Sequence, residues 1–152
     1  MARPNFLRFI NLWPPLLGAG IRVTRMDADM KAVDVELRMH FWNRNYVGTH
    51  YGGSLYSVAD AFYMLMLIHH LGSDFIIWDK AASIRFRKPG RGTVRAEFRL
   101  STGQIQDIRD IMTRQEKYEP TFLVELKDSS GEVVASVEKL LYIRRKKVQV
   151  AV

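Results

Sequence analysis

The sequence predicts a single α+β domain in which an antiparallel sheet of about six strands wraps around one long central helix. Two stretches of alternating apolar and polar residues come first, a long apolar stretch of helical character follows, and about four further alternating stretches complete the chain. Strands that are neighbours along a chain can pair antiparallel, which distinguishes this class from domains of alternating strands and helices. The 152 residues fit one domain, with an N-terminal helical arm over 1–18 and a basic tail over 144–152.

The N-terminal segment predicts a short amphipathic helix that docks on the body of the domain. Its large apolar residues recur at helical spacing: Phe6, Phe9, Ile10 and Trp13. Pro14 and Pro15 are expected to end this helix. Polar residues interrupt the segment, so it does not predict a secretory signal. The longest apolar stretch, Ala61 to Ile68, is far below the ~20 residues that cross a bilayer, so we expect a soluble, cytoplasmic protein without a membrane partner.

The strands and the central helix follow in order. Ile21–Met26 and Ala32–Met39 alternate as half-buried strands do, with a turn between them. After an irregular stretch, the helix is predicted over Tyr51–Leu71, with Gly72 at its C-terminal end. Four further segments have strand character: Phe75–Arg87, Thr93–Leu100, Thr121–Lys127 and Val133–Ile143. Gln104–Gln115 is ambiguous between a strand and a loop with helical tendency.

Composition restricts the chemistry and the partners. The absence of cysteine excludes disulfide scaffolds, zinc fingers, iron–sulfur clusters and cysteine nucleophiles. The adjacent pair His69–His70 points in two directions on a helix, so no metal site is predicted. Lys and Arg exceed Asp and Glu by 23 − 16 = 7, which fits nucleic acid, an anionic membrane or a ligand that carries phosphate.

Asp60 is the informative residue of the helix, because it lies in its most apolar part. A carboxylate there must be hydrogen-bonded, have a raised pKa or face a cleft, and both a structural and a catalytic role fit. Gly52 and Gly53 stand at the helix start, where free backbone N–H groups can bind a developing oxyanion. A carboxylate and such amides are together sufficient for hydrolysis of an acyl group.

These residues lie in a segment that resembles a known family. Asn45 is followed by five residues, then by Tyr51, Gly52 and Gly53, and Ala59–Asp60 comes after five more. This segment resembles the hotdog-fold acyl-CoA thioesterases, and most closely the phenylacetyl-CoA and other aryl- or acyl-CoA thioesterases, in which a His stands where this chain has Tyr51. The segment Ser83–Thr93 is similar to the strand and turn that follow in that fold. The resemblance covers about residues 20 to 145 and implies a hotdog fold.

The resemblance also implies roles. Asp60 would be the general base or the nucleophile, the Gly52 N–H, with Gly53, would polarise the thioester carbonyl, and Asn45 would help to position substrate or water. In relatives the Asn and Gly come from one subunit and the Asp from the other, which implies a homodimer or a dimer of dimers. Further substrate contacts would come from Tyr51, His50, Tyr63, Arg87, Lys88 and Arg91. The last three would bind the phosphates of coenzyme A, although a solvated sheet face is the favoured explanation for any single arginine, and no cofactor beyond this part of the substrate is expected.

Three other functions stay open. The main alternative is a non-catalytic hotdog protein that binds an acyl group or coenzyme A, with Asp60 as a structural residue; Tyr51 in place of His keeps it open. A hotdog dehydratase would pair a loop His with a helix acid, and the spacing of His50 does not match that pattern. A nucleic-acid module would require the basic residues to share one face, and no nucleic-acid partner is expected.

Overall fold

The structure, a computed structural model, describes residues 9–146. The first part of the predicted N-terminal arm and the end of the predicted basic tail lie outside these residues. The elements follow one another as η1 (Ile10–Leu12), α2 (Pro14–Ala19), β1 (Ile21–Met26), β2 (Ala32–Leu37), α3 (Gly52–Val58), α4 (Phe62–Leu71), β3 (Phe75–Phe86), β4 (Val94–Arg99), α5 (Thr102–Arg114), β5 (Lys117–Tyr118), β6 (Thr121–Lys127) and β7 (Val133–Arg145).

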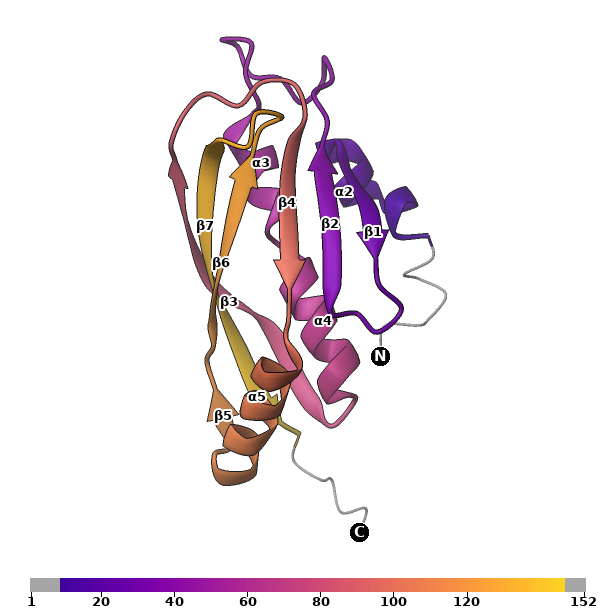
Figure 1. Cartoon of the computed structure of the whole chain (residues 1–152), viewed down its shortest axis with the longest axis vertical. Helices are drawn as coiled ribbons and strands as arrows, with labels where there is room; N and C mark the ends of the chain where they lie inside the picture. The colour runs from indigo at the N-terminus through magenta and orange to yellow at the C-terminus, as the bar shows by residue number, and fades with distance from the viewer. Residues whose placement is uncertain (1–8, 147–152) are drawn as a thin grey trace.

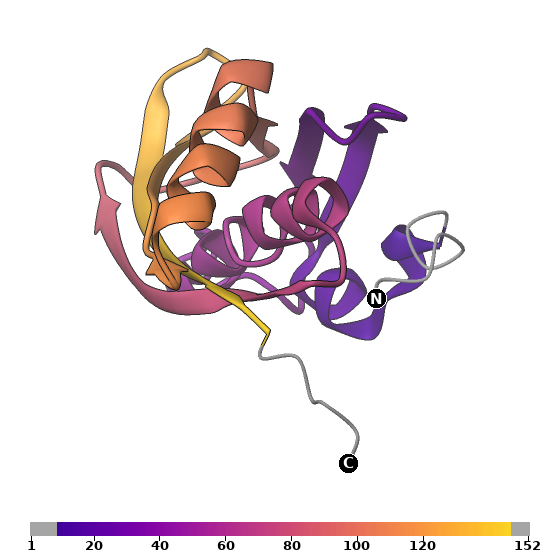
Figure 2. The ribbon, with the colours of Figure 1, turned by 90° about the horizontal axis from the view of Figure 1, so that it is seen from below.

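The strands form one seven-stranded antiparallel sheet, in agreement with the predicted α+β class. Its order is β1-β2-β4-β6-β7-β3, and the short β5 pairs with β7. β3 is the longest partner of β7 and stands at one end of this order, so its other edge has no strand beside it within residues 9–146. The sheet curves around α3 and α4, which lie against its concave side (Figures 1 and 2).

The core lies between the sheet and this helical segment. Val58, Phe62, Met66 and Leu67 are fully enclosed, because the segment is apolar on most of its circumference. The strands supply the opposing layer with alternate residues, as β4 illustrates by burying every second side chain. Phe98 of β4 packs its ring 4.9 Å from the ring of Phe62. These contacts fix the position and the rotation of the helical segment relative to the sheet.

The predicted single helix over Tyr51–Leu71 is wrong in one respect, because the helix is interrupted at Asp60. α3 ends at Val58 and α4 begins at Phe62. Between them the N–H groups of Ala59 and Asp60 donate to carbonyl groups three residues back, at 3.0 and 3.3 Å, which is the bonding of a tight turn rather than of an α-helix. Asp60 is thereby presented at a turn, with an exposed side chain.

Three predictions about the other helical segments and the tail also require correction. Pro14 and Pro15 follow the end of η1 at Leu12, but they also begin a second helix, α2, because proline is tolerated in the first turn, where its missing N–H has no partner to lose. The ambiguous segment Gln104–Gln115 is helical except for its last residue, since it lies in α5, which ends at Arg114. The predicted basic tail begins later than residue 144, since β7 runs to Arg145.

α5 is stabilised by its N-terminal cap and by one apolar face. The Ser101 hydroxyl accepts a hydrogen bond from the Gln104 N–H at 3.1 Å, and the Gln104 side chain accepts one from the Ser101 N–H at 2.9 Å. Ile105, Ile108 and Met112 are buried on the inner face. Arg109 donates to the His70 carbonyl oxygen at 2.7 Å, so α5 also binds the end of α4 (Figure 2).

Ser101→Ala should lower the free energy of unfolding by about 1 kcal/mol, because the N–H of Gln104 loses its acceptor. Urea unfolding followed by circular dichroism measures the change. Ser129→Ala, in the exposed turn between β6 and β7, is the matched control and should change the stability little. An unchanged midpoint for Ser101→Ala would contradict the role of the cap.

Candidate functional site

A pocket of about 530 Å³ lies where the helix start meets the turn between β3 and β4. Its lining combines backbone at the start of α3, the loop that precedes it and a basic segment. The lining residues are Asn45, Val47, Thr49, His50, Gly52, Leu55, Phe86, Arg87, Lys88, Pro89, Gly90 and Arg91. The pocket therefore joins apolar surface to free backbone donors and to positive charge.

The start of α3 supplies the backbone donors. As in the first turn of any helix, the Gly52 and Gly53 N–H groups have no helical acceptor, and none occurs elsewhere in the described chain. The Phe86 ring lies against Gly52, where an added Cβ would come within 3.1 Å of it. The ring of Tyr51 covers Gly53 in the same way, at 2.3 Å from an added Cβ. Glycine is needed at both positions so that aromatic rings can approach the backbone closely.

Asn45 holds the loop that leads to the helix. Its side-chain oxygen accepts hydrogen bonds from the N–H groups of Val47 and Thr49, at 3.1 and 2.9 Å. Its side-chain nitrogen donates to the Thr49 hydroxyl at 2.8 Å and to the His50 carbonyl at 3.3 Å. The Asn45 amide, predicted to position substrate or water, thus spends its hydrogen bonds within its own loop. It fixes the shape of the loop that lines the pocket.

His50 fixes this loop to the turn after β3. Its N–H donates to the Gly90 carbonyl at 2.9 Å, and its Nε2 lies 2.7 Å from the Gly92 carbonyl oxygen. A carbonyl can only accept, so this geometry assigns the proton to Nε2. The ring is buried, and burial lowers the pKa of the imidazole below its ordinary value despite the Gly92 contact. His50 is therefore a neutral structural link that also lines the pocket.

The three basic residues of the pocket differ in their availability. Lys88 forms ion pairs with Asp128, at 2.6 Å, and with Glu132. These two acids raise the pKa of the Lys88 ammonium. Through the two ion pairs, Lys88 is bound to the turn between β6 and β7. Arg87 and Arg91 form no ion pair within residues 9–146, and Arg91 only donates to the Gly48 carbonyl at 3.2 Å. The uncompensated charge of the pocket is that of the two arginines.

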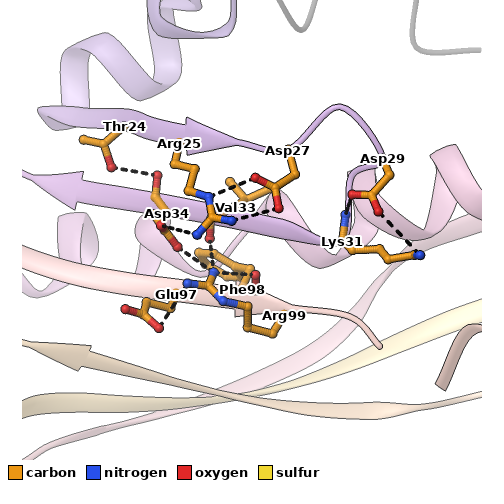
Figure 3. Close-up of polar contacts among 10 residues, drawn as sticks. All are labelled: Thr24, Arg25, Asp27, Asp29, Lys31, Val33, Asp34, Glu97, Phe98 and Arg99. Atoms are coloured by element: carbon orange, nitrogen blue, oxygen red, sulfur yellow. Dashed lines mark hydrogen bonds and ion pairs between the residues drawn. The ribbon is translucent and has the colours of Figure 1, made fainter. Parts of the chain in front are cut away.

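Two further arginines, Arg95 and Arg99, lie on the outer sheet face. Arg99 pairs with Asp34 at 2.5 Å and with Glu97 at 3.2 Å, and Figure 3 shows this network crossing β1, β2 and β4. Arg95 pairs with Glu36 at 3.1 Å on the same face. The interpretation as a solvated sheet face is confirmed for these two residues.

Asp60 lies elsewhere, in a second cluster of charged groups. The Lys139 ammonium of β7 is 3.4 Å from Oδ1 of Asp60 and 3.1 Å from Oδ1 of Asp79 on β3. The Lys139 side chain is 1% exposed, whereas that of Asp60 is 56% exposed. Burial raises the pKa of the Asp79 carboxyl, and the nearby Asp60 charge adds to this effect while Lys139 opposes it. We call Asp60, Asp79 and Lys139 the Lys139 cluster.

The structure brings some of the predicted site residues together and separates others. The pocket collects six of them: Asn45, Gly52, His50, Arg87, Lys88 and Arg91. Tyr51 and Gly53 adjoin it without lining it. Tyr63 is buried in the core, where its ring stacks on Phe122 at 4.3 Å.

Sequence reasoning predicted Asp60 but missed Phe86 and the two partners of Asp60 in the Lys139 cluster, Asp79 and Lys139. Strand alternation offered a signal for Lys139, because it stands between the inward-facing Val137 and Leu141 on β7. For Phe86 the only signal was its place just before the basic turn.

Residues 9–146 contain no group of three His, Cys, Asp or Glu side chains that could hold a metal ion. No helix among them has the length and apolar character needed to cross a membrane.

Comparisons with known proteins agree with the fold. A family model described as "Domain of unknown function (DUF4442)" matches residues 4–143. A solved structure from Pseudomonas aeruginosa, described as a protein of unknown function and probable thioesterase, is 27% identical with a TM-score of 0.73, over 84% of this chain and 85% of that one. The search of curated proteins found no match.

Two more distant structures show the same fold. A thioesterase from Haemophilus influenzae is 10% identical with a TM-score of 0.68, over 95% of this chain and 92% of that one. A protein of unknown function from Chlorobaculum tepidum is 14% identical with a TM-score of 0.73, over 92% and 91%. The resemblance to thioesterase-like hotdog-fold proteins is thus confirmed.

The link through His50 predicts a pH-dependent stability. Because the folded state lowers the pKa of His50, the neutral ring stabilises the protein above the unfolded value of about 6.5, and this contribution is lost as the pH falls. The melting temperature should therefore decrease between about pH 7.5 and about pH 5.5. His50→Gln should start lower at pH 7.5, since it loses the Gly92 bond, and then decline less steeply.

His69→Gln is the control for this prediction, because His69 is an exposed histidine on α4. Its melting temperature should decline as steeply as that of the wild type. Some decline should remain in His50→Gln, because burial also lowers the pKa of His70. Equal slopes for His50→Gln and the wild type would contradict the assignment.

Proposed function

The chain belongs to the family described as a domain of unknown function (DUF4442), and we propose that it hydrolyses the thioester bond of an acyl-CoA. The observation that carries this proposal is the pocket. It is lined by Gly52, whose N–H is free, and by Arg87 and Arg91, which form no ion pair within residues 9–146. A thioester carbonyl needs a donor where negative charge develops, and the phosphates of coenzyme A need cations. The thioesterase descriptions of two solved neighbours support the reaction class.

The proposed reaction uses Asp60 as general base. The Asp60 carboxylate takes a proton from water while the water oxygen attacks the thioester carbon. The carbonyl oxygen gains negative charge and is stabilised by the Gly52 N–H, with Gly53 beside it. The carbon–sulfur bond then breaks, and the leaving thiolate takes the proton back from Asp60. The products are a carboxylic acid and coenzyme A.

Asp60 and Gly52 would have to come from two copies of the chain. Eight residues separate them, which is about 12 Å along a helix, and Asp60 does not line the pocket. A two-fold axis can bring Asp60 of one copy to Gly52 of the other. The free edge of β3 supports such a pairing, because it is 12 residues long and carries the exposed Trp78 and Phe86.

The roles of the remaining predicted residues follow from their contacts. We assign phosphate binding to Arg87 and Arg91, since Lys88 is already neutralised by Asp128 and Glu132. Asn45 and His50 act indirectly, because their polar groups hold the loop that carries the pocket wall. A non-catalytic protein that binds coenzyme A remains the second candidate, and the occupied amide of Asn45 favours it.

Asp60→Asn should reduce thioester hydrolysis by about 10²–10⁴-fold, because the amide cannot accept a proton. A panel of short, long and aryl acyl-CoA substrates, assayed through the released thiol, measures the change. Acyl-N-acetylcysteamine thioesters, which lack the nucleotide, should show a higher KM if Arg87 and Arg91 bind phosphate.

Two outcomes would contradict this function. Equal turnover by the wild type and Asp60→Asn would remove Asp60 from the mechanism. Binding of coenzyme A without turnover of any substrate would favour the non-catalytic protein.

A shared site predicts complementation between two inactive variants. Gly52→Val should be inactive because the new side chain meets the Phe86 ring, and Asp60→Asn should be inactive for the reason above. In mixed dimers one site combines an intact Gly52 with an intact Asp60, so co-expression should restore part of the activity. Each variant expressed alone is the control. A strictly monomeric protein in light scattering, or no restoration in isolated mixed dimers, would contradict a site made by two copies.

A further inference from the structure

Lys139 is the most unusual residue that the proposed mechanism leaves unused. It lies on the inner face of β7, among the apolar side chains of the core, and has no exposed surface. A buried ammonium is costly unless carboxylates pair with it. A lysine in this position therefore requires the specific groups that surround it.

Those groups come from three elements. The turn between α3 and α4 supplies Asp60 at 3.4 Å, and β3 supplies Asp79 at 3.1 Å. α3 supplies the Tyr56 ring, whose centre is 5.5 Å from the ammonium. β6 supplies only an uncharged partner, because Phe122 pairs with Lys139 in the sheet. One cation thus serves two carboxylates, which gives the Lys139 cluster a formal charge of −1.

The two carboxylates differ in a way that suggests a division of roles. Asp79 is mostly buried, with a side chain 20% exposed, whereas the side chain of Asp60 is 56% exposed. Lys139 contacts Oδ1 of Asp60, and no other side chain of residues 9–146 bonds to this carboxylate. Oδ2 bonds to no side chain of residues 9–146, and the carboxylate is largely exposed, which is the arrangement that a base acting on water requires.

We infer that Lys139 is a positioning residue that orients the Asp60 carboxylate, and that Asp79 offsets part of the cost of burying the ammonium. This inference rests on the proposed thioester hydrolysis. Because the ammonium contacts the carboxylate directly, changes at Lys139 or Asp79 should move the pH profile of hydrolysis, which a purely structural role would leave in place. The interrupted helix serves the same end, since the turn at Asp60 brings the carboxylate to Lys139 instead of leaving it on a continuous helix face.

The test follows the acid limb of kcat/KM, which reports the pKa of the base in the free enzyme. Asp79→Asn removes a competing carboxylate and leaves the cation to Asp60, so the limb should move to lower pH. Lys139→Met combined with Asp79→Asn removes the buried pair together and leaves no unpaired charge in the core. The acid limb of kcat/KM of this double variant should lie about one pH unit above that of Asp79→Asn, and the kcat of the double variant should be lower.

Lys127→Met is the matched control, because this lysine is exposed on β6 and pairs only with Glu125. Its pH profile should match that of the wild type. A limb in the double variant that coincides with that of Asp79→Asn would overturn the inference. If the double variant does not fold, Asp79→Asn decides alone, and a limb that stays in place or moves to higher pH would overturn the role of Lys139.

Failure of the proposed function gives a different result. In that case Asp60→Asn would keep full turnover, whatever the Lys139 variants do. Loss of activity in Asp60→Asn together with an unshifted limb in both Lys139-cluster variants would leave the hydrolase standing and remove Lys139 from it.

Discussion

Burial of the apolar segment that contains α3 and α4 is the constraint on which the other features of the structure depend. Val58, Phe62 and Met66 can leave water only if the sheet curves around them, because a helix that is apolar on most sides needs cover on most sides. Once the helix is enclosed, its start is fixed against the end of β3, where Phe86 contacts Gly52. The same packing fixes Asp60 opposite β7. The positions of the two candidate reacting groups are therefore consequences of core packing and not of the loops.

The sequence predicted the features that follow from periodicity and failed where distant contacts decide the outcome. Alternation was sufficient for strands such as β4 and β6, because they bury every second side chain. The interruption at Asp60 could not be read from the helix itself, since the partner of Asp60 is Lys139, 79 residues further along the chain. The segment of α5 was ambiguous because its apolar residues are few, and its cap at Ser101 was the signal that would have identified it. The helix that begins at Pro14 was not predicted, because the effect of proline depends on whether it stands in the first turn or later.

The residues of the candidate site show the same difference between local pattern and distant contacts. The residues close together in sequence, Asn45, His50 and Gly52, do meet in the pocket with Arg87 and Arg91. Residue type alone could not show that Lys88 is neutralised, because its partners Asp128 and Glu132 come from a hairpin about forty residues away. It also could not show that the Asn45 amide is engaged by its own loop. A resemblance to a family therefore predicts the positions of site residues more reliably than their roles, because a role depends on which polar groups remain free.

The pocket and the Lys139 cluster carry charges of opposite sign. The arginines of the outer sheet face are compensated by Asp34, Glu36 and Glu97, so they add little to the field near the pocket. The excess of positive charge at the pocket is that of Arg87 and Arg91, while the Lys139 cluster carries a formal negative charge. The cations assigned to the substrate are therefore different residues from the cation that contacts Asp60. In the proposed reaction, a second copy of the chain would bring Asp60 to the pocket.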